Sequence, residues 1–268
     1  MSSSVCEIED KDSQYLFEII FPTCNSFRQI LQFLNQFHKT IPLVFTKKGV
    51  QIRKENDKKT CVFEGNIYSF NLIKYYIDPD EIKDDQEYVV HVPIAPFLNN
   101  LKKIQKKQEI RIRRLKESPD YIQIILDESY TRYAEIRIDP CKTKPCKYIV
   151  EDFRPRENPN ITMKLTAFNF LTETTGGSSD RKVKLTMYDY GVSITSASLH
   201  GGSGLNEGNC TGKKLAEIEV PTETIKSMIK LSSLSEEGIV RFYCLDESHI
   251  RLEIPISVIG TISLYLID

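Results

Sequence analysis

The sequence lacks the features by which several large classes of protein are identified. No apolar run approaches the roughly 20 residues that a membrane-spanning helix needs. The polar and acidic start of the chain has no apolar core like that of a signal peptide. The formal net charge is −1, so total charge alone predicts neither a nucleic-acid nor a membrane partner. We therefore expect an intracellular globular protein that does not bind membranes.

Cysteine and histidine are few and scattered along the chain. The seven cysteines are odd in number, which indicates a reducing compartment and argues against a disulfide framework. Cys141 and Cys146 are spaced like half of a zinc site, but no second Cys or His pair lies at ligand spacing. The four histidines are equally dispersed. The sequence therefore predicts no metal.

The motifs of common catalytic and cofactor-binding sites are also missing. Thr211-Gly-Lys-Lys214 lacks both the glycine spacing and the hydroxyl residue of a phosphate-binding P-loop. The polar stretch 174–181 has the composition of a turn, which we prefer to a phosphate cradle. Dinucleotide-binding, zinc-protease and serine-hydrolase motifs are absent as well. We therefore predict a protein that is not an enzyme and has no cofactor.

A proline-rich stretch divides the chain into two parts that resemble each other. Residues 139–155 contain three prolines and no helical or alternating apolar pattern, which predicts an extended connector. We expect a disordered tail over 1–14, an N-terminal domain over 15–138 and a similar C-terminal domain over 156–268.

Each half repeats one order of elements twice. A strand is followed by an amphipathic helix, whose apolar residues recur with helical period, and then by alternating strands. The predicted helices span 26–39, 96–107, 166–175 and 222–231. Predicted strands that follow the first hairpin span 60–64, 67–73 and 87–92. The sequence therefore predicts an α+β fold of two similar domains, each a duplicated βαβββ unit.

Basic charge is concentrated on the first two predicted helices, although the whole chain is nearly neutral. These helices contain six basic residues and no acid: Arg28, Lys39, Lys102, Lys103, Lys106 and Lys107. The third predicted helix contains Glu173, and the fourth contains Glu223, Lys226 and Lys230. Lysines often only solvate a helix surface. If the helices share one face, however, that face attracts a polyanion.

Several stretches together carry a resemblance that covers nearly the whole chain. They are Leu16-Phe-Glu18, the helix Phe27–Phe37, Lys48-Gly-Val-Gln-Ile52, Met163-Lys-Leu165 with Phe168, Tyr190-Gly-Val-Ser-Ile-Thr-Ser-Ala-Ser198, Gly201-Gly-Ser-Gly204 and Ile259-Gly-Thr-Ile-Ser-Leu-Tyr-Leu266. In order, spacing and length, the chain resembles the sliding clamps of the proliferating cell nuclear antigen (PCNA) family. Its divergence is typical of a clamp from a large DNA virus or a divergent eukaryote.

The resemblance implies a homotrimeric ring whose helices line a hole around double-stranded DNA. Such a clamp holds DNA through sequence-independent phosphate contacts. Arg28, Lys102 and Lys230 fall where the family has its basic residues, and the expected neighbours are Lys39, Lys103, Lys106, Lys107 and Lys226. The third helix departs from the family because it has Glu173 and no basic residue, and Arg181 and Lys182 just beyond it are the candidates to compensate.

The resemblance also implies a pocket for short peptides of partner proteins, bordered by the connector. Its loop wall would be Tyr148, Ile149 and Val150, and its floor Thr60, His249, Tyr265 and Ile267. The expected partners are a DNA polymerase, other clamp-binding proteins of replication and repair, and a clamp loader. The expected location is the nucleus or a viral replication compartment. A simpler interpretation is that Tyr148–Val150 only fixes the connector to the sheet.

Ring closure in the family pairs edge strands of neighbouring subunits, for which Tyr130–Arg137 and the segment after Ser198 are the candidates here. That segment is rich in Gly and Asn, which form strands poorly. Three alternatives to a homotrimer therefore stay open. They are a subunit of a heterotrimeric checkpoint clamp, a non-ring viral processivity or transcription factor, and a DNA-binding protein outside any ring.

Overall fold

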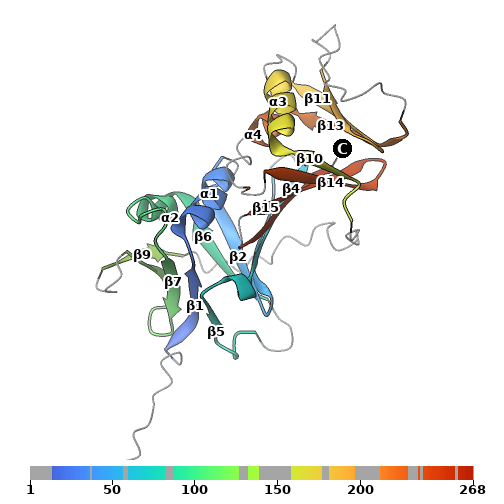
Figure 1. Ribbon diagram of the computed structural model, residues 1–268. Coiled ribbons are helices and arrows are strands. Elements are labelled where there is room, and N and C mark those ends of the chain that lie inside the picture. Colours follow the sequence, from blue (N-terminus) through green and yellow to red (C-terminus); the bar gives the residue numbers. More distant parts are fainter. Residues whose placement is uncertain are drawn as a thin grey trace, which may run out of the picture.

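The computed structural model describes most of the chain (Figure 1). The described residues are 14–36, 38–56, 60–82, 87–126, 132–138, 158–176, 181–196, 212–228, 235, 238–256 and 259–267. The predicted connector, and all of the predicted N-terminal tail except Gln14, lie outside them. The expected domain boundaries therefore stay predictions.

The first half contains two helices and most of the strands. Its elements are β1 (Tyr15–Phe21), α1 (Cys24–Leu34), β2 (Thr40–Thr46), β3 (Gly49–Glu55), β4 (Cys61–Tyr68), the 3-10 helix η1 (Ser69–Asn71), β5 (Lys74–Ile77), β6 (Tyr88–Pro93), α2 (Ile94–Leu101), β7 (Ile110–Leu115), β8 (Tyr121–Ile125) and β9 (Tyr133–Arg137). Apolar residues alternate or run continuously in these strands, as expected for sheets buried on one or both faces.

The second half repeats this order with fewer described strands. Its elements are β10 (Ile161–Lys164), α3 (Leu165–Gly176), β11 (Lys182–Tyr188), β12 (Val192–Thr195), β13 (Lys214–Pro221), α4 (Thr222–Met228), β14 (Ile239–Asp246), β15 (His249–Ile256) and β16 (Gly260–Ile267). A strand, a helix and at least two further strands therefore follow one another four times along the chain. The predicted α+β fold of repeated units is confirmed.

One antiparallel sheet runs through both halves. Its strand order is β10-β14-β15-β16-β4-β3-β2-β6, and the two halves meet where β16 pairs with β4. This pairing extends from Gly260 opposite Ile67 to Leu266 opposite Cys61. Two smaller sheets, β5-β1-β7-β8-β9 and β12-β11-β13, complete the fold. The halves are therefore joined by a full strand pairing.

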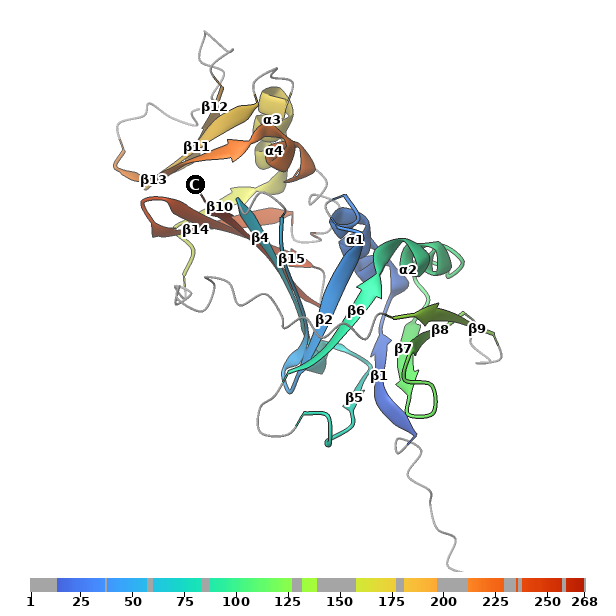
Figure 2. The ribbon, with the colours of Figure 1, turned by 180° about the vertical axis from the view of Figure 1, so that it is seen from behind.

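The helices form two pairs on the same side of the shared sheet, as Figure 1 and Figure 2 show. Helix α1 contacts α2, and α3 contacts α4. The buried ring of Phe27 lies 4.6 Å from that of Phe21 in β1 and 5.9 Å from that of Phe97 in α2. Similarly, Phe168 of α3 lies 5.6 Å from Phe242 of β14. Each pair is fixed to a sheet by its apolar side, which leaves the polar side outward.

Two strands of the second half differ from their counterparts in strand pairing. In the first half, β5 covers one edge of β1 and β4 covers one edge of β3. In the second half, β10 is the counterpart of β1, and β12 is the counterpart of β3. Within the described residues, β10 pairs only with β14, and β12 pairs only with β11. Strand β9 likewise pairs, in this part of the chain, only with β8. The glycine-rich segment after Ser198, expected to take part in ring closure, lies outside the described residues.

Two predicted elements differ from those observed. Helix α2 ends at Leu101, before the predicted end at 107, because the N–H groups of Lys103 and Ile104 donate to carbonyl oxygens three residues back, at 3.0 and 3.2 Å. Such bonds form a tighter turn than an α-helix. The predicted strand 67–73 is wrong beyond Tyr68, where η1 turns the chain towards β5. Helix α1 also begins and ends earlier than predicted.

Among the described residues, no helix has the length and apolar character to cross a membrane.

Candidate nucleic-acid and partner interfaces

The start of α1 is bonded to the turn that follows α2. The backbone N–H groups of Cys24 and Asn25 donate to the carbonyl oxygens of Gln108 and Lys106, at 2.8 and 3.1 Å. These bonds satisfy donors that the start of a helix leaves without an intrahelical partner. They also hold residues 102–108, which we call the lysine segment, against the first turn of α1.

The opposite end of the pair is joined in the same way. The N–H of Ile94, the first residue of α2, donates to the carbonyl oxygen of Lys39 at 2.9 Å. Because α2 has eight residues, at about 1.5 Å of rise each, Lys39 lies about 12 Å along the helix axis from the lysine segment. The two helices are therefore antiparallel, with basic residues at both ends.

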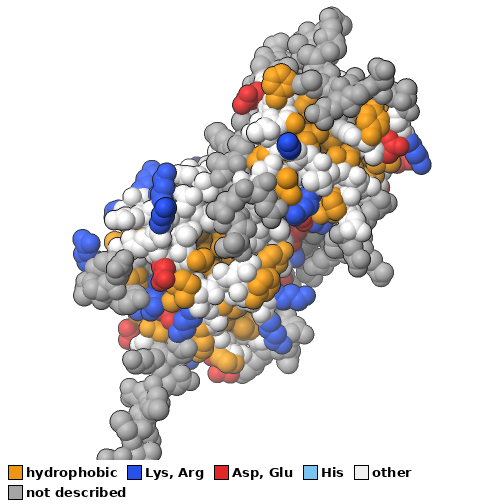
Figure 3. Space-filling model, in the orientation of Figure 1, with side chains coloured by type: hydrophobic (Ala, Val, Ile, Leu, Met, Phe, Trp, Pro, Cys, Tyr) orange, Lys and Arg blue, Asp and Glu red, His pale blue; other side chains and the backbone are white. Residues whose placement is uncertain are grey.

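The lysine segment forms an exposed basic surface. The side chains of all four of its lysines, at 102, 103, 106 and 107, are exposed, and Lys103 donates to Oδ1 of Asn100 at 2.8 Å. Figure 3 shows Lys and Arg side chains gathered beside α2. No Asp or Glu occurs over residues 88–108 or 22–54. No carboxylate of α1, α2 or the lysine segment therefore neutralises this charge.

Arg28 lies in the first helical turns of α1, close to the lysine segment. Its side chain is half-buried, and one terminal nitrogen donates to Oδ1 of Asn25 at 3.2 Å. Burial raises the pKa of the neighbouring Cys24 thiol, while the positive charge of Arg28 lowers it. Arg28 is thus a positioned charge, whereas the lysines beside it are solvent-exposed.

The second helix pair repeats the same backbone bonds. The N–H of Thr222, the first residue of α4, donates to the carbonyl oxygen of Arg181 at 3.1 Å, and that of Leu165, the first residue of α3, to Gly238 at 2.8 Å. Arg181 therefore occupies the place of Lys39, and its side chain is likewise exposed. From the sequence, Arg181 was expected only to compensate for the missing basic residue of the third helix. Its equivalence to Lys39 depends on backbone hydrogen bonds, which the sequence does not show.

The second pair differs from the first in charge. Its exposed side chains include Glu173 of α3 and Glu223 of α4. Lys226 belongs to α4, but its side chain is not among those described, and Lys230 lies outside the described residues. The structure thus brings Arg28 and the four lysines of the lysine segment together and places Lys39 at the other end of the same helix pair, whereas it does not place the side chains of Lys226 and Lys230.

The segments that follow α2 and α4 explain the difference at the level of sequence. Gln108 and Gly238 accept equivalent backbone bonds, so in chain order the segment 102–107 corresponds to the segment 229–237. The first segment contains four lysines and no acid. The second contains one lysine, Lys230, together with Glu236 and Glu237. The backbone bonds of the first helix pair are therefore repeated in the second pair, but the basic charge is not.

Three of the predicted peptide-binding residues lie together at one end of the shared sheet. His249 is paired with Ile267 across β15 and β16, and the N–H of Ile267 donates to the carbonyl oxygen of Thr60 at 3.0 Å. All three are partly exposed. Nδ1 of His249 lies 2.8 Å from the carboxylate of Asp246, which fixes the imidazole ring. Tyr148, Ile149 and Val150 lie outside the described residues.

The fourth predicted residue, Tyr265, has a different environment. Its side chain is buried, and its hydroxyl group donates to Oε2 of Glu64 at 2.8 Å. Burial raises the pKa of this phenol, and the negative charge of Glu64 raises it further. Glu64 also accepts from Arg53 at 3.2 Å. Tyr265 therefore links β16 to β4 through its bond to Glu64 and contributes little exposed surface.

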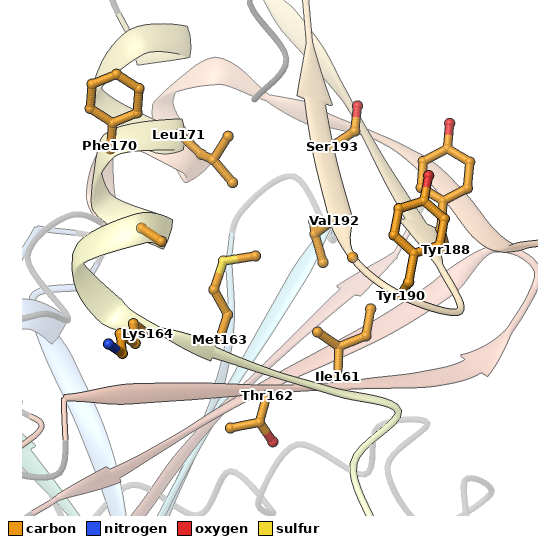
Figure 4. Close-up of a pocket in the computed structure, with 12 residues that line it drawn as sticks. Ile161, Thr162, Met163, Lys164, Phe170, Leu171, Tyr188, Tyr190, Val192 and Ser193 are labelled. Carbon is orange, nitrogen blue, oxygen red and sulfur yellow. The ribbon is translucent and has the colours of Figure 1, made fainter. Parts of the chain in front are cut away.

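The second half also holds a hollow of about 540 Å³ that sequence reasoning missed (Figure 4). Met163, Leu171 and Val192 point into it, and Tyr188 and Tyr190 stack 5.7 Å apart beside it. It lies between β10 and β12, whose first-half counterparts are covered by β5 and β4. The hollow occupies the place where the first half has additional strands, so we do not interpret it as a ligand site.

Within the described residues, no group of three or more His, Cys, Asp or Glu side chains is arranged to hold a metal ion.

Comparison with known proteins gives matches to the fold but not to the sequence. No family model matches the chain, and neither does any curated protein. PCNA from Entamoeba histolytica matches with a TM-score of 0.74 and 12% identity, over 94% of this chain and 98% of that chain. A chain of the PCNA2–PCNA3 complex from Sulfolobus tokodaii matches with a TM-score of 0.67 and 17% identity, over 93% of this chain and 98% of that chain.

The structure thus defines an α+β protein in which repeated units place two helix pairs on one side of a sheet shared by both halves. This is the fold of the PCNA-type sliding clamps, and the predicted resemblance is confirmed at the level of fold. At identities of 12% and 17%, the likeness shows the fold alone. The function must be argued from the residues.

Proposed function

We propose that this protein is a non-enzymatic DNA sliding clamp, which tethers a DNA polymerase and other replication and repair proteins to double-stranded DNA. The observation that carries the proposal is the basic surface of the first helix pair. It combines Arg28 and the lysine segment, and α1, α2 and the segment itself contain no acid. In a clamp fold, this surface would face the DNA.

The chemistry of the basic surface suits a protein that slides. Exposed lysines contact phosphates without base recognition, so they attract duplex DNA of any sequence. Contacts of this kind exchange readily, because they depend on charge and not on a fixed hydrogen-bond geometry. Encirclement by a closed assembly would then keep the protein on DNA in place of tight binding.

The assembly we propose is a homotrimer, placed on DNA by a clamp loader in a nucleus or a viral replication compartment. The pocket formed by Thr60, His249 and Ile267, together with Tyr148–Val150, would receive short peptides of the partner proteins. Tyr265 would not contact the peptide directly. Its bond to Glu64 would hold β16 against β4 and so keep the pocket residues in place.

Light scattering across protein concentrations and at two salt concentrations tests the assembly. A stable species near three times 30.9 kDa is expected for the homotrimer. Retention on DNA then tests encirclement, because a closed ring stays on nicked circular DNA and slides off the ends of the same DNA after linearisation. Equal retention on both forms would contradict a sliding clamp and would indicate an ordinary DNA-binding protein.

A heteromeric clamp is the second candidate function. The charge difference between the two helix pairs favours it, because other subunits would then supply the missing basic surface. One of the similar structures is itself a complex of two clamp proteins, PCNA2 and PCNA3. A monomer at all concentrations in light scattering, with closure only after addition of a second clamp protein, would favour this candidate over the homotrimer.

A further inference from the structure

A surface groove of about 460 Å³ lies at the far end of β4 from the proposed peptide pocket. It is formed by the β2–β3 turn, the end of β4 and η1. Thr60 precedes the first residue of β4, and Tyr68 is its last. At about 3.3 Å per residue, the eight residues of β4 separate the two places by about 25 Å. The groove is therefore distinct from the pocket.

The groove is fixed by backbone contacts that hold its walls together. The N–H of Ser69 in η1 donates to the carbonyl oxygen of Lys48 in the turn at 2.9 Å. The hydroxyl group of Tyr75 lies 2.6 Å from the carbonyl oxygen of Thr46 and 2.8 Å from that of Gly49. The turn and η1 are thus bonded to each other, and the groove is built before any ligand binds.

An exposed apolar surface borders the groove. The side chain of Phe70, which lines the groove, is 80% exposed. Phe70 stacks on Tyr68 with ring centres 5.4 Å apart and an angle of 6° between the planes. One face of Phe70 is therefore supported, while most of the ring stays in water. Exposed aromatic side chains at a preformed hollow are typical of interaction sites.

The described residues that line the groove carry charge of one sign. Lys47 and Lys48 are exposed at its rim, and none of the described residues that line it is Asp or Glu. An acidic ligand is therefore favoured over a basic one. Single-stranded nucleic acid is less suitable, because such sites stack successive bases on several aromatic rings. Here the two aromatic rings, Tyr68 and Phe70, stack on each other and Tyr68 is half-buried, so only the ring of Phe70 is largely exposed to bases.

We propose that this groove docks an acidic peptide segment of another protein, with an aromatic or aliphatic residue inserted beside Phe70 and a carboxylate near Lys48. The buried side chains of Val50 and Ile67 form part of the groove lining. The site would give the protein a second place to hold partners, at the opposite end of β4 from the peptide pocket.

Selection from a random library of twelve-residue peptides displayed on phage tests the proposal on the full-length protein. We expect enriched peptides to carry a large apolar residue flanked by Asp or Glu. A synthetic peptide of the enriched sequence, followed by fluorescence anisotropy, should bind at least tenfold more weakly to Phe70→Ser and to Lys48→Glu. Phe170→Ser is the matched control, since Phe170 is another exposed phenylalanine, at 54%, on α3 in the other half.

Four results would overturn the proposal. Selected peptides whose binding does not depend on Phe70 would show that the groove is not a peptide site. Peptides that depend on Phe70 but lack acidic residues would refute the assigned ligand chemistry. Phe70-dependent binding of a twelve-nucleotide oligo(dT) that competes with the peptide would assign the groove to nucleic acid. A change of molecular mass with Phe70→Ser would assign it to contacts between copies of this chain.

Discussion

The backbone N–H of Asn25 donates a hydrogen bond of 3.1 Å to the carbonyl oxygen of Lys106. The first turn of α1 and the lysine segment are therefore one structural unit, held by main-chain atoms. The lysine side chains take no part in this bond. They can be shortened without removing the contact that positions the helix pair, so their electrostatic role can be tested separately from the fold.

We expect simultaneous change of Lys102, Lys103, Lys106 and Lys107 to Ala to weaken binding to duplex DNA. The slope of log K against log salt is negative, and it should become shallower by about 0.9 for each phosphate that the variant no longer neutralises. Fluorescence anisotropy of a labelled duplex at several salt concentrations measures both quantities. The matched control removes four other exposed lysines, in the β2–β3 turn, on β11, and at or just before the start of β13: Lys48, Lys184, Lys213 and Lys214. An equal loss of affinity in the control would mean that total charge, and not this surface, governs binding.

Reversal of the two acids that follow α4 should have the opposite effect. The double change Glu236→Lys and Glu237→Lys gives the second half a segment more like the lysine segment, so DNA affinity and its salt dependence should both rise. A control pair, Glu117→Lys and Asp120→Lys, adds the same charge in the exposed turn between β7 and β8. If both pairs raise the affinity equally in the same titration, the segment after α4 is not near DNA.

We expect Gly49→Ala to destabilise the protein strongly, by about 3 kcal/mol or more. Gly49 has a φ of 140°, and a Cβ atom there would lie 2.0 Å from the carbonyl oxygen of Ile67. Gly191 occupies the corresponding hairpin turn of the second half, but a Cβ atom there would meet nothing within 4 Å. Urea unfolding should therefore show a much smaller change for Gly191→Ala, and similar midpoints for the two variants would contradict the assigned close contact.

The thiol of Cys61 should be unreactive in the folded protein. It is buried, and burial raises its pKa to about 12, so at pH 8 only about one molecule in ten thousand carries the reactive thiolate. Burial raises the pKa of Cys24 as well. Mass spectrometry after iodoacetamide treatment should find both residues unmodified in native protein and modified in urea. Rapid native labelling at either site would mean that β4 or α1 opens readily.

The repeat and the helix faces were predictable from the sequence, because apolar periodicity and strand-turn patterns are local. The end of α2 was not, since residues 102–107 form helices well by composition but are held in turns by contacts with α1. The burial of Tyr265, in contrast to the exposed pocket residues, could not be predicted from the sequence either. It depends on the bond to Glu64, a residue 201 positions away in sequence.

The two helix pairs show the same limit. Equivalent backbone bonds identify Arg181 with Lys39, a relationship that no sequence pattern indicates. The exposed Phe70 was equally unpredictable, since its place in a supposed strand suggested burial. Charge could be counted along the sequence, but its arrangement on one antiparallel helix pair depends on the tertiary structure.

The pairing of β16 with β4 has a mechanical consequence. Seven successive residue pairs connect the halves, so bending the chain at its midpoint would require rupture of a continuous ladder of hydrogen bonds. The subunit should thus behave as a stiff arc and not as two hinged lobes. In the ring that we propose, any gap that admits DNA would then have to open at the seams between subunits.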